Sequence, residues 1–384
     1  MRILTLCYEF PPIGGGGSRV VAGLSAELVR AGHSVDLVTM RFRGQPREEV
    51  VNGARVYRVS CLRRSPSICS PPEMATYLAS ALPLAHRLIR QNGYDLNHTH
   101  FIFPDGVLAL ALKQLTGLPY VVTAHGSDVP GFNPDRFALA HRLLRPAWQR
   151  VVAGAAGLVT PSRNLEQLIT RARPGVRAVV IPNGIDPRTF SADRPRRRRI
   201  LVVARLFERK GVQHVIRAMA GLRHDHELHV IGAGPYQSTL VALARELSVD
   251  VRFHGWLEPG SLPLADLYET ADIFVHSSDI ENFPMVLLEA MAAGLAIITT
   301  RGTGCDEVVG DAGLLVDPGD IGALRAALMT LMADPARRVA LGAAARRRLV
   351  SQFSWTSVTR RYTALYDSVL TSLTAAEAVT AHVA

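Results

Sequence analysis

The stretch Met1-Arg-Ile-Leu-Thr-Leu-Cys-Tyr-Glu-Phe-Pro-Pro-Ile-Gly-Gly-Gly-Gly-Ser18 joins a short apolar run to four consecutive glycines. An Ala/Leu-rich segment of helical period comes next, so this order predicts a strand over 3–8, a loop, and a helix over 18–31. Glycines at such a turn let the backbone approach a ligand, and the helix N-terminus favours an anion. A tight turn needs glycines as well, so the loop indicates a binding site only in combination with other signals.

The alternation of strand and helix patterns continues along the 384 residues. In the first half, helices are expected at 73–91, 105–116, 136–153 and 162–171, and further strands at 35–40, 55–59, 95–99, 120–124, 158–160 and 178–181. After the polar, Arg-rich stretch 191–199 the pattern restarts, with strands at 200–203, 227–231, 251–254, 273–276, 296–300 and 314–316. We therefore predict an α/β fold of two Rossmann-like, doubly wound parallel-sheet domains facing a central cleft. The domains span 1–186 and 187–355, and a helix over about 356–384 packs back on the first.

Composition limits the class of protein. The hydrophobic share of 48% and the charged share of 20% are typical of a globular chain, and the formal charge of +10 attracts phosphates. Four cysteines without Cys-x-x-Cys spacing favour a reducing cytoplasm and indicate no zinc site. The first apolar run is too short for a signal peptide, and no segment has the length of a membrane span, so we expect a cytoplasmic protein.

The glycine loop does not match a nicotinamide site. Such a site carries an acidic residue at the end of the second strand, which binds the ribose. Here the second predicted strand ends in Thr39-Met40-Arg41. A nicotinamide cofactor is therefore disfavoured.

Two cations lie just after the first strand of the second half. In Ala204-Arg-Leu-Phe-Glu-Arg-Lys-Gly211, Arg205 lies just past the strand and Lys210 at the start of the next helix. A guanidinium and an ammonium that converge on a helix N-terminus can clamp a diphosphate. A solvated basic turn has the same pattern, so the pair indicates a phosphate site only in combination with the acidic motif of residues 281–289.

Two glutamates lie eight positions apart in Glu281-Asn-Phe-Pro-Met-Val-Leu-Leu-Glu289, and the apolar run continues to Gly294. Proline and glycine at its two ends predict a helix over 284–293. The first N–H groups of a helix lack intrahelical acceptors, so those of 282–285 can meet an oxygen-rich ligand. Glu289 is flanked by apolar residues, so it needs a partner, either the hydroxyls of a ligand or a structural cation.

In this order the motifs resemble glycosyltransferase family 4, the retaining, sugar-nucleotide-dependent transferases of the GT-B architecture. The likeness rests on Glu281 and Glu289, and on the motifs that precede them: Pro-Pro-Ile-Gly-Gly at 11–15, Thr-Ala-His-Gly-Ser-Asp at 123–128, Pro-Asn-Gly-Ile-Asp at 182–186, Arg205 with Lys210, and Gly-Ala-Gly-Pro at 232–235. It covers nearly the whole chain. Alanine at 204 and at 233 departs from the family pattern, and neither change removes a charged group.

The resemblance implies a role for each motif. Arg205 and Lys210 would grip the diphosphate of the donor, Glu289 its ribose, and Glu281 the transferred sugar, with His125 near the 6-position of that sugar. The implied catalytic residues are His125, Arg205, Lys210 and Glu281, and the implied acceptor-side residues are His100, Ser127 and Asp128. The implied donor-binding residues are Gly15, Gly16, Arg205, Lys210, Gly232, Gly234, Glu281, Asn282, Phe283, Pro284, Met285 and Glu289.

The implied reaction moves a hexose-type sugar from a nucleoside-diphosphate sugar, such as a UDP-sugar or GDP-mannose, to a hydroxyl of a lipid, glycan or small metabolite. The anomeric configuration is kept, and the leaving phosphate helps to take the acceptor's proton. Asp-x-Asp does not occur in the sequence, so we expect no metal ion and no cofactor besides this co-substrate. The catalytic contribution of the protein is then positioning and charge stabilisation.

Alternatives remain open from the residues. A sugar-nucleotide epimerase has the same architecture, and a basic protein that binds nucleic acid or membrane explains the charge but leaves the paired glutamates without a role. His98 and His100 lie on one strand face, where they suit the acceptor side better than a metal site without a third ligand. Arginines at 136, 142, 145 and 150, interleaved with Phe137, Leu143, Leu144 and Trp148, suit either a solvated helix or peripheral membrane contact. We expect no nucleic-acid partner, and the sequence predicts no oligomeric state.

Overall fold

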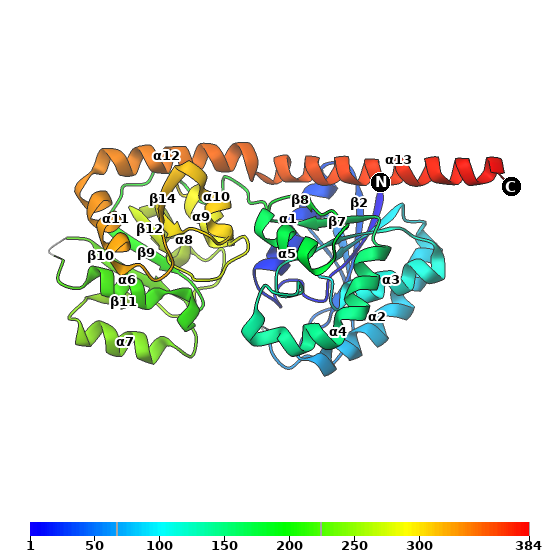
Figure 1. Ribbon diagram of the computed structural model, residues 1–384, viewed down its shortest axis with the longest axis horizontal. Helices are drawn as coiled ribbons and strands as arrows, with labels where there is room; N and C mark the ends of the chain where they lie inside the picture. Colours follow the sequence, from blue (N-terminus) through cyan, green and yellow to red (C-terminus); the bar gives the residue numbers. More distant parts are fainter. Residues whose placement is uncertain (67, 223–224, 384) are drawn as a thin grey trace. The chain divides into compact units, whose positions relative to one another are not determined.

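The computed structural model describes residues 1–66, 68–222 and 225–383, with side chains except those of 134–137 and 376–383 (Figure 1). The chain divides into two compact units, Met1–Gly184 with Trp355–Ala384, and Ile185–Ser354. The first boundary lies two residues before the predicted one, and the second lies one residue before it. Within the described residues, none of the helices combines the length and apolar character that a membrane span requires.

The first unit is built on an eight-stranded sheet of order β3-β4-β2-β1-β5-β6-β7-β8. Neighbouring strands are parallel except for the antiparallel pair β3 and β4. The strands are β1 (Arg2–Leu6), β2 (Ser34–Met40), β3 (Glu48–Val51), β4 (Ala54–Val59), β5 (Leu96–His100), β6 (Tyr120–Thr123), β7 (Gly157–Thr160) and β8 (Val179–Val180).

Helices cover both faces of this sheet, because successive residues of each strand point to opposite faces and both sets are apolar. Leu4 and Leu6 face a core formed with α2 (Pro71–Asn92), α3 (Asp105–Thr116), α4 (Pro134–Gly154) and α5 (Arg163–Ala172). Ile3 faces the other core, formed with α1 (Gly16–Arg30) and α13 (Trp355–Val383). Trp355 opens α13 and packs on Gly23 and Gly184, where any Cβ would overlap its ring. The C-terminal helix therefore packs on the first unit.

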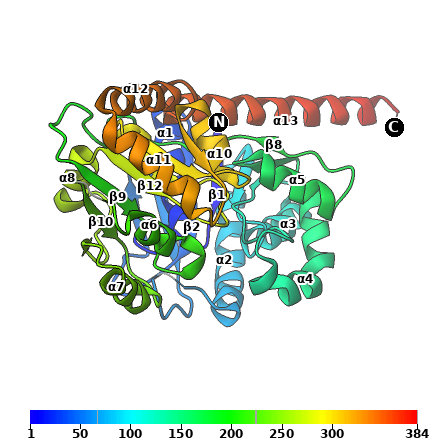
Figure 2. The same cartoon turned by 60° about the vertical axis from the view of Figure 1, so that its left-hand side comes forward.

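The second unit is built on a six-stranded sheet with helices packed on it (Figure 2). The strand order is β11-β10-β9-β12-β13-β14, and all neighbouring strands are parallel. The strands are β9 (Arg199–Val203), β10 (Glu227–Ile231), β11 (Val251–Phe253), β12 (Ile273–His276), β13 (Ala296–Thr300) and β14 (Gly313–Val316). One core lies under α6 (Val212–Met219), α7 (Gln237–Glu246) and α11 (Ile321–Ala333). The other lies under α8 (Leu262–Thr270), α9 (Met285–Ala292), α10 (Gly304–Val309) and α12 (Pro335–Gln352).

Both sheets contain a topological switch point. The chain order reverses between β1 and β5 in the first unit and between β9 and β12 in the second. In open parallel sheets, ligands bind in the crevice outside the carboxyl ends of the strands at such a point. The loops after β1, β9 and β12 carry Gly15, Arg205, Lys210 and residues 281–284, whereas His125, Ser127 and Asp128 follow β6, and Gly232 and Gly234 follow β10.

The larger differences from the predicted elements lie in the first sheet. β3 was not predicted, because Glu48 and Glu49 break the apolar pattern; it pairs with β4 through a turn at Asn52-Gly53, both with positive φ. The first strand ends at Leu6 rather than residue 8, and the last strand of the first unit is reduced to Val179–Val180.

Candidate functional site

In the second unit, backbone contacts hold together the loops after β9 and β12. Gly211 has φ +71°, and a Cβ there would overlap the carbonyl oxygen of Ser277. The Ser277 hydroxyl donates to the Gly211 carbonyl at 2.8 Å, and the amide of Asp279 donates to the carbonyl of Arg209 at 2.9 Å. This packing fixes the turn η1 (Glu208–Lys210) against the loop that carries Glu281.

Three ionisable side chains meet at this junction. Lys210 forms a salt bridge with Oε1 of Glu281, and Nε2 of His276 lies 3.0 Å from the same oxygen. Burial raises the pKa of Glu281, but Lys210 and His276 outweigh it and lower that pKa. Burial lowers the pKa of His276, but contacts with Cys305 and Glu281 raise it to about 9. At pH 7 the cluster therefore holds two cations and one anion, an excess that attracts an anionic ligand.

Arg205 lies in the exposed part of the same loop. Its guanidinium carbon is 5.6 Å from the centre of the Phe207 ring, and that of Arg209 is 5.7 Å from it. Arg209 is thus a further cation of the same turn, one that the sequence analysis did not single out. The turn brings three cationic residues to the carboxyl end of β9.

Glu289 is buried inside α9, and the hydroxyl of Tyr268 donates to its Oε2 at 2.7 Å. The sequence predicted a ligand or a structural cation as the partner. The structure shows one donor, a phenol that α8 carries 21 positions earlier in the chain, and the ligand or cation stays a prediction. A hydroxyl satisfies one carboxylate oxygen without neutralising the charge.

The segment before α9 is buried. Asn282 and Phe283 are both largely inaccessible, and a Cβ at Gly304 would overlap the carbonyl oxygen of Asn282. Pro284 precedes the helix as its N-cap, and Met285 is the first helical residue, one position later than predicted. Backbone packing between this segment and the start of α10 holds the loop of Glu281 in place.

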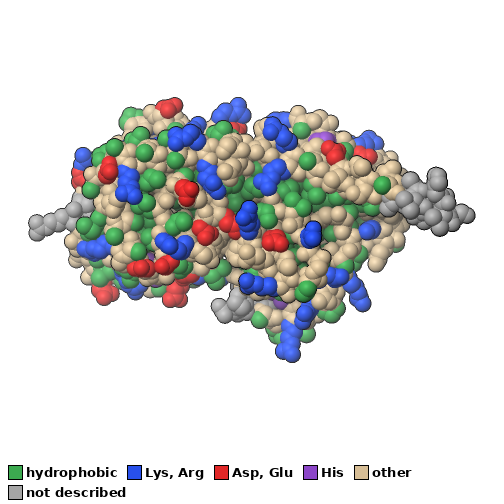
Figure 3. Space-filling view, turned by 45° about the horizontal axis from the view of Figure 1, so that its top comes forward, with side chains coloured by type: hydrophobic (Ala, Val, Ile, Leu, Met, Phe, Trp, Pro, Cys, Tyr) green, Lys and Arg blue, Asp and Glu red, His purple; other side chains and the backbone are tan. Residues whose placement is uncertain are grey.

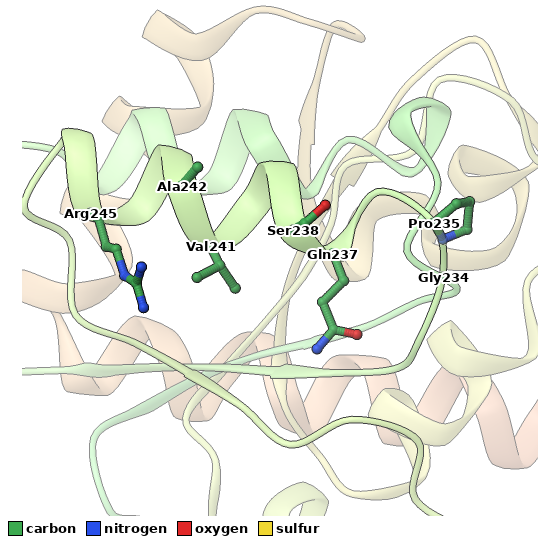
Figure 4. Close-up of a pocket in the computed structure, with 7 residues that line it drawn as sticks. All are labelled: Gly234, Pro235, Gln237, Ser238, Val241, Ala242 and Arg245. Carbon is green, nitrogen blue, oxygen red and sulfur yellow. The ribbon is translucent and has the colours of Figure 1, made fainter.

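Gly232 and Gly234 have packing roles of their own. A Cβ at Gly232 would overlap the carbonyl oxygen of Ala204, and one at Gly234 the carbonyl oxygen of Leu206. Gly234 and Pro235 also line a pocket of about 600 Å³ with Gln237, Ser238, Val241, Ala242 and Arg245 of α7 (Figure 4). The donor-binding role of these glycines stays a prediction, because the backbone contacts alone already require glycine.

In the first unit, His125 lies in the loop after β6 and Asp128 holds that loop. Oδ1 of Asp128 accepts hydrogen bonds from the amides of His125 (3.0 Å) and Gly126 (2.8 Å), and Oδ2 accepts one from the amide of Ile102 (2.8 Å). Asp128 is buried, so its position is that of a loop organiser. Ser127 is exposed. The acceptor-side roles of both residues stay predictions.

The first turn of α1 lies next to His125. A Cβ at Gly17 would come within 3.7 Å of Nδ1 of His125 and 2.8 Å of Cζ of Phe101. Phe101 has φ +72° and its ring centre is 4.4 Å from that of His125. Gly15 and Gly16 are exposed at the helix N-terminus. The glycine loop and His125 are therefore brought together through Gly17 of that loop and through Phe101, a residue that the sequence did not single out.

His100 does not lie at the surface, as an acceptor-side role would require. It is 1% exposed, and its Nδ1 shares a hydrogen bond of 3.1 Å with Nε2 of His125. His98 is buried as well, with Nε2 2.8 Å from the hydroxyl of Thr123 and Nδ1 2.7 Å from that of Tyr366. The expectation for His100 is thus corrected to a buried position next to His125. Burial lowers the pKa of His125 to about 4 and that of His98 to about 3.

Helix α4 has an exposed apolar and basic segment. Leu139 and Leu143 are 70% and 71% exposed, and Arg142 and Arg145 are exposed beside them. Trp148, predicted on this surface, is instead buried, and its Nε1 donates to the carbonyl of Asp128 at 3.0 Å. The side chains of 136 and 137 lie outside the described residues. Elsewhere, Lys and Arg side chains are scattered over the face shown in Figure 3 rather than gathered in the stripe typical of nucleic-acid-binding proteins.

The described side chains include no group of three or more His, Cys, Asp or Glu residues that could hold a metal ion. His98 and His100 have hydroxyl, phenol and imidazole neighbours instead.

Comparison with known proteins assigns both halves of the chain. Residues 14–189 match the family model described as Glycosyltransferase Family 4, and residues 188–348 match Glycosyl transferases group 1. The glycogen synthase of Mycobacterium tuberculosis is 32% identical over 93% of this chain and 92% of its own length. Sucrose-phosphate synthase from Thermosynechococcus elongatus superposes with a TM-score of 0.79 at 23% identity, covering 97% of this chain and all of that one.

A second solved structure, Anabaena HepE in complex with UDP-glucose, superposes with a TM-score of 0.75 at 17% identity, over 96% of this chain and 100% of that one. At such identities the two structures show a shared fold and nothing more. The fold they share with this chain is the one predicted, two parallel-sheet α/β units of the GT-B architecture.

Proposed function

Since the chain belongs to glycosyltransferase family 4, we propose that it transfers a hexose-type sugar from a nucleoside-diphosphate sugar to a hydroxyl acceptor, with retention of the anomeric configuration and without a metal ion. The observation that carries the proposal is the cluster of Lys210, Glu281 and His276 at the switch point of the second unit. A net positive, largely buried cluster at the carboxyl ends of parallel strands suits a diphosphate.

In the proposed reaction the cationic residues bind the diphosphate, and the carboxylates bind hydroxyl groups. Lys210, with Arg205 on the same turn, receives the diphosphate and stabilises the charge that develops on it as the glycosidic bond breaks. Glu281 stays ionised because its pKa is lowered, so it accepts hydrogen bonds from hydroxyls of the transferred sugar. Glu289, oriented by Tyr268, accepts those of the ribose. His125 is neutral at pH 7 and contributes a hydrogen bond to the sugar rather than a charge.

The proposal that the donor contains a nucleotide is supported by HepE, which was crystallised with UDP-glucose and shares the fold. Peripheral contact with a membrane is the role that we propose for the exposed leucines and arginines of α4, in line with a lipid acceptor or a membrane-bound product.

The test uses the purified protein with UDP-, GDP- and ADP-sugars, each with lipid, glycan and small-metabolite acceptors, in the presence of EDTA. We expect release of nucleoside diphosphate only with an acceptor, and a product whose anomeric configuration in NMR matches that of the donor. Conversion of the donor without acceptor would indicate an epimerase. Failure to bind or cleave every donor would contradict the proposal.

A further inference from the structure

The first unit contains a connected set of buried polar side chains that the proposed reaction does not yet use. It begins at the phenol of Tyr366 on α13, passes through the imidazoles of His98 and His100 on β5, and ends at His125. The links are a 2.7 Å hydrogen bond, a ring contact with centroids 4.2 Å apart, and a 3.1 Å hydrogen bond. Around it lies an apolar core of the β1, β2, β6 and β7 strands.

The three imidazoles of this connected set are neutral, so their contacts decide which ring nitrogen carries the proton. Burial lowers the pKa of all three histidines, so each carries one N–H and one bare nitrogen at pH 7. The neighbours of a neutral histidine decide which nitrogen has the proton. For His125 the neighbour on Nε2 is Nδ1 of His100, while its Nδ1 lies on the side of Gly17 in the first turn of α1.

We propose that His100 is a positioning residue for His125: it holds Nε2 of that ring and thereby fixes the tautomer and orientation in which Nδ1 is presented toward the glycine loop. The inference rests on the proposed function for its kinetic consequence, but its structural part stands without it. His98 keeps His100 in place from the other side, since both of its ring nitrogens are within hydrogen-bond distance of hydroxyls, those of Thr123 and Tyr366.

The geometry explains why β5 has histidines at these positions. His98 and His100 lie two residues apart on one strand, so they share a face, and in the parallel register His100 is opposite Thr123, two residues before His125. An apolar residue at 100 would fill the same core. It would remove the imidazole that Nε2 of His125 contacts, and the ring could then rotate or change tautomer.

The test compares Asn and Gln at position 100, which carry the same amide at different reach. The amide of His100→Asn falls near the Nδ1 position and that of His100→Gln near Nε2, and His100→Phe removes the polar group. One readout is the imidazole ¹⁵N spectrum of protein labelled at its 13 histidines. The other is kcat and KM for the donor that the wild type uses.

We expect a single-tautomer pattern for His125 in the wild type and in His100→Asn, and a shifted or mixed pattern in the Gln and Phe variants. We expect kcat to fall roughly tenfold in the Gln and Phe variants, as for loss of one hydrogen bond, with the donor KM within about twofold and recovery in the Asn variant. A His125 spectrum that does not change, equal Asn and Gln variants, or an effect on KM alone would overturn the proposal.

Two further outcomes are separated by the same experiment. If the wild type turns over no donor, the proposed function fails, and the spectra still decide whether His100 sets the tautomer of His125. If the spectra shift but kcat does not, His100 has no positioning role in the reaction and the inference is wrong. If His100→Phe does not fold, the Asn and Gln pair carries the comparison.

Discussion

Replacing Lys210 with Met separates two roles that the structure allows for this ammonium group. As the partner of Glu281 it balances a buried carboxylate, and as a diphosphate ligand it binds the donor. Lys210→Met keeps most of the length of the side chain and removes the charge. Breaking a buried ion pair from one side costs about 3–5 kcal/mol, but both side chains are 13% exposed and His276 still contacts Glu281, so we expect a loss of about 1–3 kcal/mol in the free energy of unfolding.

Donor affinity gives the second readout. A hydrogen bond between an ammonium and a phosphate is worth about 1.5–3 kcal/mol, so Kd for the nucleoside-diphosphate sugar should rise by about 10- to 150-fold in calorimetric titration. Adding Glu281→Gln to Lys210→Met removes the uncompensated carboxylate, and stability measured by urea unfolding should recover in part. Affinity should not recover, because the missing cation is not replaced.

The double variant also provides the refutation. If Lys210→Met/Glu281→Gln binds the donor as well as Glu281→Gln alone, Lys210 serves only to balance its partner and the diphosphate assignment is wrong. A matched control is Arg198→Met, which removes a cation from the exposed pair that Arg198 forms with Asp225, just before β9 and thus at the opposite end of that strand. This control should change neither affinity nor stability by more than about 0.5 kcal/mol.

Three other predictions concern a single hydrogen bond, a buried carboxyl group and two exposed leucines. In Tyr268→Phe, Glu289 loses its 2.7 Å donor, so the free energy of unfolding in urea should fall by about 1–2 kcal/mol; an unchanged curve would show that the hydroxyl contributes nothing. Burial raises the pKa of Asp105 to about 8, above its unfolded value, so its contribution to stability is complete at low pH and is lost as pH rises toward 8. Stability should therefore fall by up to about 1.4 kcal/mol per pH unit between pH 5 and 8, and the slope should flatten in Asp105→Asn. Leu139→Ser/Leu143→Ser should lower co-sedimentation with phosphatidylglycerol vesicles, and unchanged binding would exclude α4 as the membrane contact.

The order of elements was predictable because strands buried on both faces read as apolar runs, and helices between them have their own period. β3 was missed because its two glutamates contradict an apolar strand, although Asn52-Gly53 is a strong hairpin signal. In this segment the turn residues indicate a hairpin, but the strand residues lack the apolar pattern of a buried strand. The missed strand lies at the edge of the sheet, where half-exposed residues weaken the pattern most.

The candidate site was predictable only as a set of residue types. Lys210 and Glu281 were both identified, but the sequence placed them on different parts of a ligand, and only the adjacency of β9 and β12 shows that they contact each other. The partners His276 and Tyr268 depend on the same tertiary arrangement. No local signal marks a phenol on α8 as the donor to a carboxylate on α9.

For glycines, the sequence does not distinguish a role in folding from a role in ligand binding. Gly211, Gly232 and Gly234 each avoid overlap with a neighbouring carbonyl oxygen of their own unit. Glycine at these positions is therefore required by folding whether or not a ligand binds. By contrast, Gly15 has open space around its Cβ position at the N-terminus of α1. Packing gives no reason for glycine there, and the predicted approach of a ligand would give one.

The cluster of Lys210, Glu281 and His276 is a second feature that folding alone does not require. A sheet built for stability alone could bury apolar side chains at the end of β12, because apolar residues of similar volume are often as stabilising as a buried ion pair, or more so. Two cations around one carboxylate also leave the cluster short of one negative charge. The diphosphate of the proposed donor carries two negative charges, which would offset this excess together with the charge of Arg205 on the same turn.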